Sequence, residues 1–349
     1  MSVRIQNALG ILSSDVPVGN LVWVDAVNGV DVLASRGRMT IPFKSLKAAK
    51  DAAVVGDTIV VLPGTYNERD LLKNGVNWHF LNGAKVNYSG ASDGGIFDTG
   101  GSSIASSITG YGEFINNATA TNSNVVLVTT ATGLNLQIQA KAMSSNKSCV
   151  KVNVSGGTVD INVALSIVSV AERTIQNLGS AELVSVRADH IRSSGGAAVY
   201  IGAGGMQVTA HRIEASGAGS DAAVAVAGSG TGSSSVRAFE IFSVNNVALR
   251  WAATAATKVA IIGARLKSTG STSNGRAVDI AGTGPNDNVR LHSCVLLASK
   301  GGSPGDGCQA WRSPGPRVDR GGASAGEPVH EPRGSASRLR VGDDRLPGR

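Results

Sequence analysis

The sequence predicts an all-β protein: a right-handed, single-stranded parallel β-helix, which is a solenoid of stacked strands, with an N-terminal capping α-helix and a disordered C-terminal tail. Three observations point to this fold. The composition has 45 glycines and only 4% aromatic residues, which favours short strands and tight turns over large helical packing surfaces. Short segments of alternating polarity follow a single helix-like stretch, and the later segments form a repeat.

The helix-like stretch TIPFKSLKAAKDAAVVG predicts a helix over residues 42–55. Apolar residues recur at helical spacing from Phe43 to Ala53, Thr40 can cap the first turn, and Gly56 ends the pattern. The next segment, GDTIVVLPGTY, holds a strand of only a few residues that stops at a Pro-Gly turn. A helix placed before the first strand can cover the open end of a solenoid, whose unpaired backbone groups otherwise invite aggregation.

The most specific signal is a two-strand repeat that begins near residue 186. One element reads VRADHIRS, VTAHRIEA, VRAFEIFS, IIGARLKS and LHSCVLLA, and a second element between its copies reads AAVYIGAG, AAVAVAGS, NVALRWAA and RAVDIAGT. The anchoring Ile or Leu of the first element falls at 191, 213, 241, 266 and 296, in steps of 22, 28, 25 and 30 residues. A strand-only repeat of this length indicates a solenoid, because each rung leaves its faces uncovered until a neighbour stacks on it. We therefore expect the second element to stack through positions 199, 224, 249 and 278.

These signals divide the chain into four parts. They are an N-terminal arm (1–20), a segment that leads into the β-helix and carries the capping helix (21–57), the parallel β-helix itself (58–300) and a tail (301–349). The tail holds six of the ten prolines and no lysine, and strand alternation stops there. Two explanations stay open: a genuine disordered tail, or an out-of-frame read of a GC-rich gene after a frameshift near codons 298–303.

Charge and cysteine content narrow the class of partner. The net charge of +7 is spread along the chain without a basic block, and few aromatic side chains are available to stack on bases, so we expect no nucleic-acid partner. No run of 18 apolar residues occurs, so we expect no membrane insertion. Three cysteines without metal-ligand spacing suggest that there is no disulfide framework.

The run VWVDAVNGVD…PFKSLKAAKDAAVVGDTIVVLPGTYNERDLLKNGVNWHF resembles the first segment of right-handed parallel β-helix proteins of the pectin-lyase-like superfamily, particularly those of bacteriophage tails and appendages. The likeness covers residues 21–90 by motif and 91–300 only by the character of the rungs. It implies the fold with good specificity. It leaves the function open, because this scaffold carries lyases, hydrolases and purely adhesive rods.

The same resemblance implies a homotrimer in the intact native protein. We identify no C-terminal trimerisation domain in this chain, and its last rung near 289–299 is expected to be uncapped, so we expect the chain as given to be a monomer or an aggregate. The first twenty residues lack the pattern of a cleaved signal peptide. We therefore expect a virion or extracellular appendage protein that is assembled after cytoplasmic synthesis.

Stacking of the repeat creates the one cluster of candidate catalytic residues. Two neighbouring columns, with one residue per rung, form it: His190, Arg212, Glu240 and Arg265 in one, and Asp189, His211 and Phe239 in the other. Strict alternation breaks at this point, which predicts a corner where these side chains face solvent. The first interpretation is a catalytic or carbohydrate-binding patch, with Glu240, Asp189, His190, His211 and Arg212 as the catalytic candidates. The second, which we favour, is a ladder of charges in which each pair contributes about 0.2–1 kcal/mol or less.

Other candidate sites have weaker signals. Trp78, Tyr200 and Trp251 are candidates for stacking on sugar rings if they are exposed, although burial is an equal alternative. The sequence DAVNGVD (25–31) has oxygen-rich spacing but no closing glutamate, so a turn held by Asx side chains is favoured over a calcium site. We expect no metal and no cofactor.

Two classes of function compete. The resemblance implies that a glycosidase of this superfamily would need a pair of carboxylates. The only Asp-Asp pair in this sequence is Asp343-Asp344, in the tail. The favoured function is therefore a non-enzymatic structural or adhesive rod in a phage tail or surface appendage, with a polysaccharide or host-surface glycan as its partner. The alternative is a polysaccharide lyase or glycoside hydrolase that acts on a surface or pectin-like polysaccharide.

Overall fold

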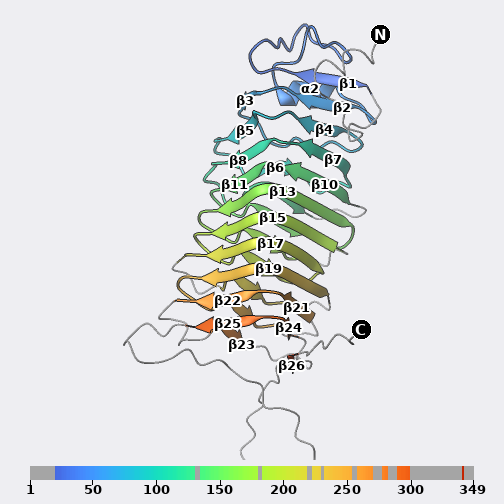
Figure 1. The fold of residues 1–349 in the computed structure, drawn as a ribbon. Coiled ribbons are helices and arrows are strands. Elements are labelled where there is room, and N and C mark those ends of the chain that lie inside the picture. The colour runs from blue at the N-terminus through green and yellow to red at the C-terminus, as the bar shows by residue number, and fades with distance from the viewer. Residues whose placement is uncertain are drawn as a thin grey trace, which may run out of the picture.

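The computed structural model is an all-β parallel solenoid in which short strands stack in one direction from the N-terminal to the C-terminal end (Figure 1). It describes residues 20–129, 134–179, 183–217, 222–228, 232–253, 258–269, 277–281, 289–298 and 340–341. The pairings between the strands are parallel throughout the described chain. This confirms the predicted fold class.

The larger sheet has 18 strands and bends at a corner into two halves. We call the half before the corner the first face. It contains β1 (Leu21–Val24), β2 (Thr58–Val61), β4 (Asn77–Phe80), β7 (Ala105–Gly110), β10 (Asn135–Ala140), β21 (Lys258–Ile262), β24 (Val289–His292) and β26 (Arg340–Val341). The half after the corner is the second face, which contains β3 (Gly64–Tyr66), β5 (Ala84–Tyr88), β8 (Glu113–Asn116), β11 (Ala142–Ser145), β22 (Arg265–Ser268) and β25 (Val295–Ala298).

Four long strands run across the corner and belong to both faces. They are β13 (Thr158–Ser169), β15 (Leu183–Ser193), β17 (Met206–Ala215) and β19 (Ser233–Ser243). The smaller sheet has eight strands and closes the solenoid. It contains β6 (Gly94–Asp98), β9 (Ser123–Thr129), β12 (Val150–Asn153), β14 (Ile175–Asn177), β16 (Val199–Ile201), β18 (Val224–Val226), β20 (Leu249–Trp251) and β23 (Val278–Ile280).

The register follows the sequence repeat. The anchoring residues Ile191, Ile213, Ile241, Leu266 and Leu296 pair in succession along the larger sheet. In the smaller sheet, the strands at 199, 224, 249 and 278 are successive parallel neighbours. Both predicted stacks are therefore confirmed.

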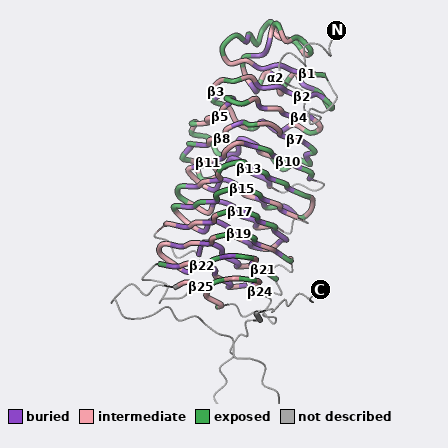
Figure 2. Tube along the Cα trace, viewed as in Figure 1, coloured by how far each residue is buried: buried purple, intermediate pink, exposed green. Residues whose placement is uncertain are grey.

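Alternation explains why these segments form strands around one core. In β15, Val184, Val186 and Ala188 are buried, whereas Arg187 is exposed. Figure 2 shows buried and exposed segments alternating along the stacked rungs. The buried side chains of successive rungs form one continuous hydrophobic cluster that begins at Val22 and reaches Leu291. Each rung thus completes the core of its neighbours, as a solenoid requires.

The capping helix is shorter than predicted. It is α2 (Leu46–Ala52), and its N-cap is Ser45, whose side chain accepts a hydrogen bond from the Ala48 amide. The predicted start was wrong because Phe43 is held in extended backbone: its amide donates to the Trp23 carbonyl, and its own carbonyl accepts from the Asp25 amide. The lid itself is confirmed, because buried Leu46 and Ala49 join the core cluster at its N-terminal end.

Several expectations concern residues outside the described ranges. The N-terminal arm lies there except for Asn20, and so does the tail except for β26. Strand β26 pairs in parallel with β24, so the last rung is not uncapped at that strand, contrary to the expectation. Among the described helical residues, none forms a helix long and apolar enough to cross a membrane.

Candidate functional site

The candidate catalytic residues lie where the long strands turn from the first face to the second. The residues His190, Arg212, Glu240 and Arg265 are register partners on β15, β17, β19 and β22. On β15, Asp189 and His190 are both exposed although they are adjacent in the chain. The break in alternation therefore marks a corner, and the column derived from the repeat is confirmed as an arrangement in space.

Ring stacking organises the second column. The rings of His211 and Phe239 are nearly parallel, with an interplanar angle of 5° and centroids 5.1 Å apart. His190 meets His211 edge to face at 6.1 Å, and the Arg265 guanidinium lies 5.7 Å from the centroid of Phe239. The ring faces are thus directed at neighbouring rungs, so Phe239 presents mainly its edge to solvent although the residue is 55% exposed.

The candidate acids lie next to basic side chains. Asp189 Oδ2 is 3.1 Å from His190 Nδ1, and Arg212 Nε lies 3.4 Å from Glu240 Oε2 and 3.2 Å from Glu214 Oε2. These side chains are partly exposed, so each pair contributes about 1 kcal/mol or less. The geometry matches the charge ladder favoured by the sequence. A catalytic role for these residues stays an untested prediction.

The aromatic candidates for sugar binding do not offer free rings. Trp78 and Trp251 are completely buried in the core, so of the two alternatives left open by the sequence, burial holds for both: they fall on inward positions of their strands. The Tyr200 ring is covered by the Arg173 guanidinium at 3.6 Å, and its hydroxyl donates to the Ala227 carbonyl at 3.0 Å. The chain neighbours of Tyr200, Val199 and Ile201, are buried and gave no sign of this cover, because Arg173 comes from the preceding rung.

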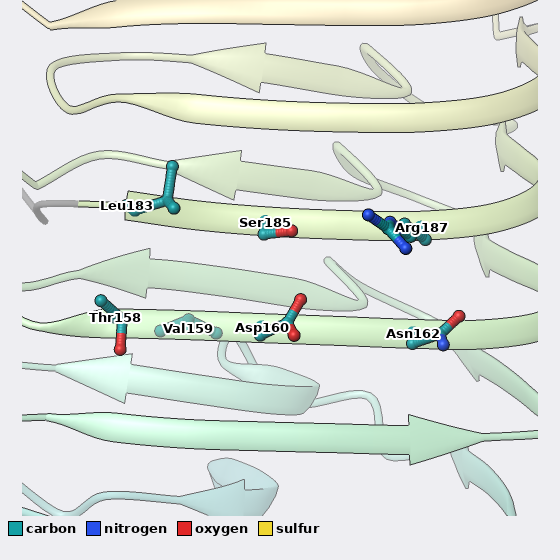
Figure 3. Close-up of a pocket in the computed structure, with 7 residues that line it drawn as sticks. All are labelled: Thr158, Val159, Asp160, Asn162, Leu183, Ser185 and Arg187. Atoms are coloured by element: carbon teal, nitrogen blue, oxygen red, sulfur yellow. The ribbon is translucent and has the colours of Figure 1, made fainter.

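A shallow hollow on the first face was not anticipated from the sequence. It has a volume of about 280 Å³ and lies between β13 and β15. Figure 3 shows its seven lining residues in two rows on adjacent strands: Thr158, Val159, Asp160 and Asn162 on one, and Leu183, Ser185 and Arg187 on the other. The available signal was the alternation within each strand, which directs Asp160, Asn162, Ser185 and Arg187 outward.

The oxygen-rich segment near the N-terminal end is a turn, as favoured. Asp25 Oδ1 accepts hydrogen bonds from the amides of Val27 and Asn28, at 2.8 and 3.1 Å. Asp31 Oδ1 accepts from the Lys44 amide at 2.7 Å, and Asp31 Oδ2 accepts from the Ser45 hydroxyl at 2.8 Å. Over the described residues, no group of three or more His, Cys, Asp or Glu side chains is placed to hold a metal ion.

Two cysteines lie in the described chain and both are free thiols. Burial raises the pKa of the Cys149 thiol far above its ordinary value and also raises that of Cys294. Neither thiol is therefore activated as a nucleophile, since the thiolate is the reactive form.

Comparison of the sequence with known protein families, curated proteins and solved structures found no match, so the parallel β-solenoid itself is the most specific classification established for this chain.

Proposed function

We propose that this chain is a non-enzymatic structural and adhesive rod, a component of a phage tail or a similar surface appendage, that presents its outer faces to host-surface glycans. The observation that supports this most directly is the state of the candidate acids. Asp189 lies against His190, and Glu240 lies against Arg212. A glycosidase instead needs two carboxyl groups that flank the scissile bond, one to donate a proton and one to act as base or nucleophile.

The outer surface of the first face supports the binding part of the proposal. Strand β10 directs Asn135, Gln137 and Gln139 outward, and all three are exposed. Strands β13 and β17 continue the surface with Asn162 and Thr209 among other polar side chains. Amide and hydroxyl groups both donate and accept hydrogen bonds, which suits them to the hydroxyl groups of a sugar chain.

A screen of the full chain against bacterial surface polysaccharides and pectins tests this proposal. Each polymer is scored for retention of the protein and for release of reducing or unsaturated ends. Retention without cleavage is expected. Cleavage that is lost in Glu240→Gln or Asp189→Asn, but kept in the control Glu113→Gln, would instead identify a polysaccharide lyase or glycoside hydrolase. Glu113 is a suitable control because this second-face glutamate also pairs with a cation: its Oε1 lies 2.7 Å from Lys141 Nζ.

A further inference from the structure

We infer that the first face binds a linear anionic glycan laid along the rod axis, with Arg187 and Arg237 holding negative groups on alternate sugars. This inference rests on the proposed function, because it names the class of glycan and the residues that select it.

The two arginines lack the partners that the other corner arginines have. Within the described chain, Arg187 and Arg237 form neither an ion pair nor a side-chain hydrogen bond, and both are exposed. Just past the corner, Arg192 lies 3.7 Å from Glu214, and Arg212 lies between Glu214 and Glu240. Arg192 and Arg212 on the second face are therefore neutralised by acids, whereas the guanidinium groups of Arg187 and Arg237 on the first face remain available to an external anion.

The hollow places groups of complementary chemistry beside Arg187. Asp160 and Asn162 on β13, with Ser185 on β15, offer acceptors and donors for sugar hydroxyls, and Leu183 offers an apolar surface for the carbon face of a ring. The volume of about 280 Å³ is below the 300–1,000 Å³ of pockets that enclose drug-sized ligands. The hollow is therefore suited to one sugar of a longer chain.

The register sets the distance between the two cationic positions. Arg187 pairs with Thr209, and Thr209 pairs with Arg237, so the two arginines occupy one column two rungs apart. Two inter-strand spacings amount to about 10 Å, which is close to the length of a disaccharide. A chain that runs along the rod with an acidic group on every second sugar would thus meet one guanidinium per acidic group. Guanidinium pairs with carboxylate and phosphate alike, in a bidentate manner.

The surroundings favour a glycan over a nucleic acid. The positions next to the arginine column on the first face carry Ser185, Gln207 and Ser235, which are register partners of one another. Binding of single-stranded nucleic acid relies on aromatic side chains on which bases stack, and small hydroxyl and amide groups occupy these positions instead. Asp160 in the hollow also disfavours a uniformly charged polyanion.

The test measures retention of the full chain on four immobilised polymers: hyaluronate, which has one carboxylate per disaccharide, a polysaccharide with one phosphodiester per disaccharide, neutral dextran and single-stranded DNA. We expect binding to one or both acidic glycan polymers and weakening by salt, since the charges are exposed. Arg187→Gln and Arg237→Gln should each weaken binding about tenfold, the effect expected for losing a hydrogen bond to a charged group. Arg192→Gln and Lys267→Gln remove the same charge from the second face and should leave binding unchanged.

The outcomes separate this inference from the proposed function. Carboxylate and phosphate sources are distinguished by which of the two acidic polymers is retained. Retention of dextran with no effect of Arg187→Gln or Arg237→Gln would overturn the inference and leave a glycan-binding rod standing. Retention of DNA alone, with loss in the two arginine variants, would replace the glycan by a nucleic acid. Failure to retain any polymer here or in the wider polysaccharide screen would overturn both.

Discussion

Ser193 is a sharp test of how the rungs are held at their turns. Its side chain is completely buried at the end of β15. The hydroxyl donates to the Glu172 carbonyl at 2.8 Å and accepts from the Gly196 amide at 3.0 Å. It belongs to a buried column at the end of the second face that runs through Ser145, Ser169, Ser193, Ala215, Ser243 and Ser268.

The expected cost of Ser193→Ala follows from which groups lose a partner. The Glu172 carbonyl keeps a hydrogen bond from the Ser169 hydroxyl at 2.7 Å, so the main loss is at the Gly196 amide. Leaving a buried donor unpaired costs about 1–3 kcal/mol. Because Gly196 is only partly buried, water can reach it in part, and we expect Ser193→Ala to lower the free energy of unfolding by about 1–2 kcal/mol.

Urea denaturation of the full chain, followed by far-UV circular dichroism, measures this change. Ser194→Ala is the matched control: it makes the same substitution one residue later, at an exposed position, and is expected to change stability by about 0.5 kcal/mol or less. Hydrogen exchange at the Gly196 amide provides a local readout, which matters because solenoids need not unfold in one step. Equal stability of the two variants, with unchanged protection of Gly196, would refute the role given to the buried hydroxyl.

Three further predictions concern the N-terminal segment and the core. Burial alone would raise the pKa of Asp57, but hydrogen bonds from Arg36 and the Val54 amide lower it below its ordinary value. The stability that Asp57 contributes is therefore present above its ordinary pKa and lost as pH falls through the lowered one. Asp57→Asn should reduce the urea midpoint at neutral pH, and the midpoint of this variant should fall less on acidification than that of the wild type. An unchanged midpoint at neutral pH would contradict this. Burial raises the pKa of Tyr66 to about 12. Its contribution to stability is therefore full below the ordinary pKa of about 10 and is lost as pH rises through about 12. Alkaline denaturation checks this, because the stability of Tyr66→Phe should depend less on pH in that window than the stability of the wild type. Trp251→Ala should cost about 3–5 kcal/mol because the ring is fully buried, whereas Phe239→Ala at the exposed corner should cost far less, and similar urea midpoints for the two would be inconsistent with the burial described.

The repeat predicted the stacking well because it is a property of the core. The anchors from Ile191 to Leu296 must meet one another to exclude water, so identical spacing around each anchor fixes the register. Residues next to an anchor inherit that register, which is why the column that contains His190, Arg212 and Glu240 could be derived before any coordinates. The sequence also located the corner, since two adjacent polar residues interrupt the alternation there.

Features that depend on side-chain direction beyond a turn were not predicted. Ser193 is followed by Ser194 and two glycines and looks like an ordinary turn residue, yet its hydroxyl points inward because the strand continues to that position. Trp251 and Tyr200 lie on short strands whose inward side is set by the preceding turn, so their burial could not be assigned from alternation over three residues. The start of α2 was misplaced because the bridge from Phe43 to β1 is a tertiary contact that overrides the local helical pattern.

The contrast between the two faces also indicates where selection for function can be sought in a solenoid. On the second face, Arg212 has acidic partners one rung away and on its own strand, Glu240 and Glu214, so stacking accounts for its presence. Arg187 and Arg237 gain nothing comparable from stacking, because the residue between them in the column is Thr209. An exposed cation without a partner adds little to stability, so the repeat supplies no reason for an arginine at either position. Comparing stability with binding in the same variants separates the two cases: substitution on the second face should affect mainly stability, and substitution of Arg187 or Arg237 should affect only the capture of an anionic glycan.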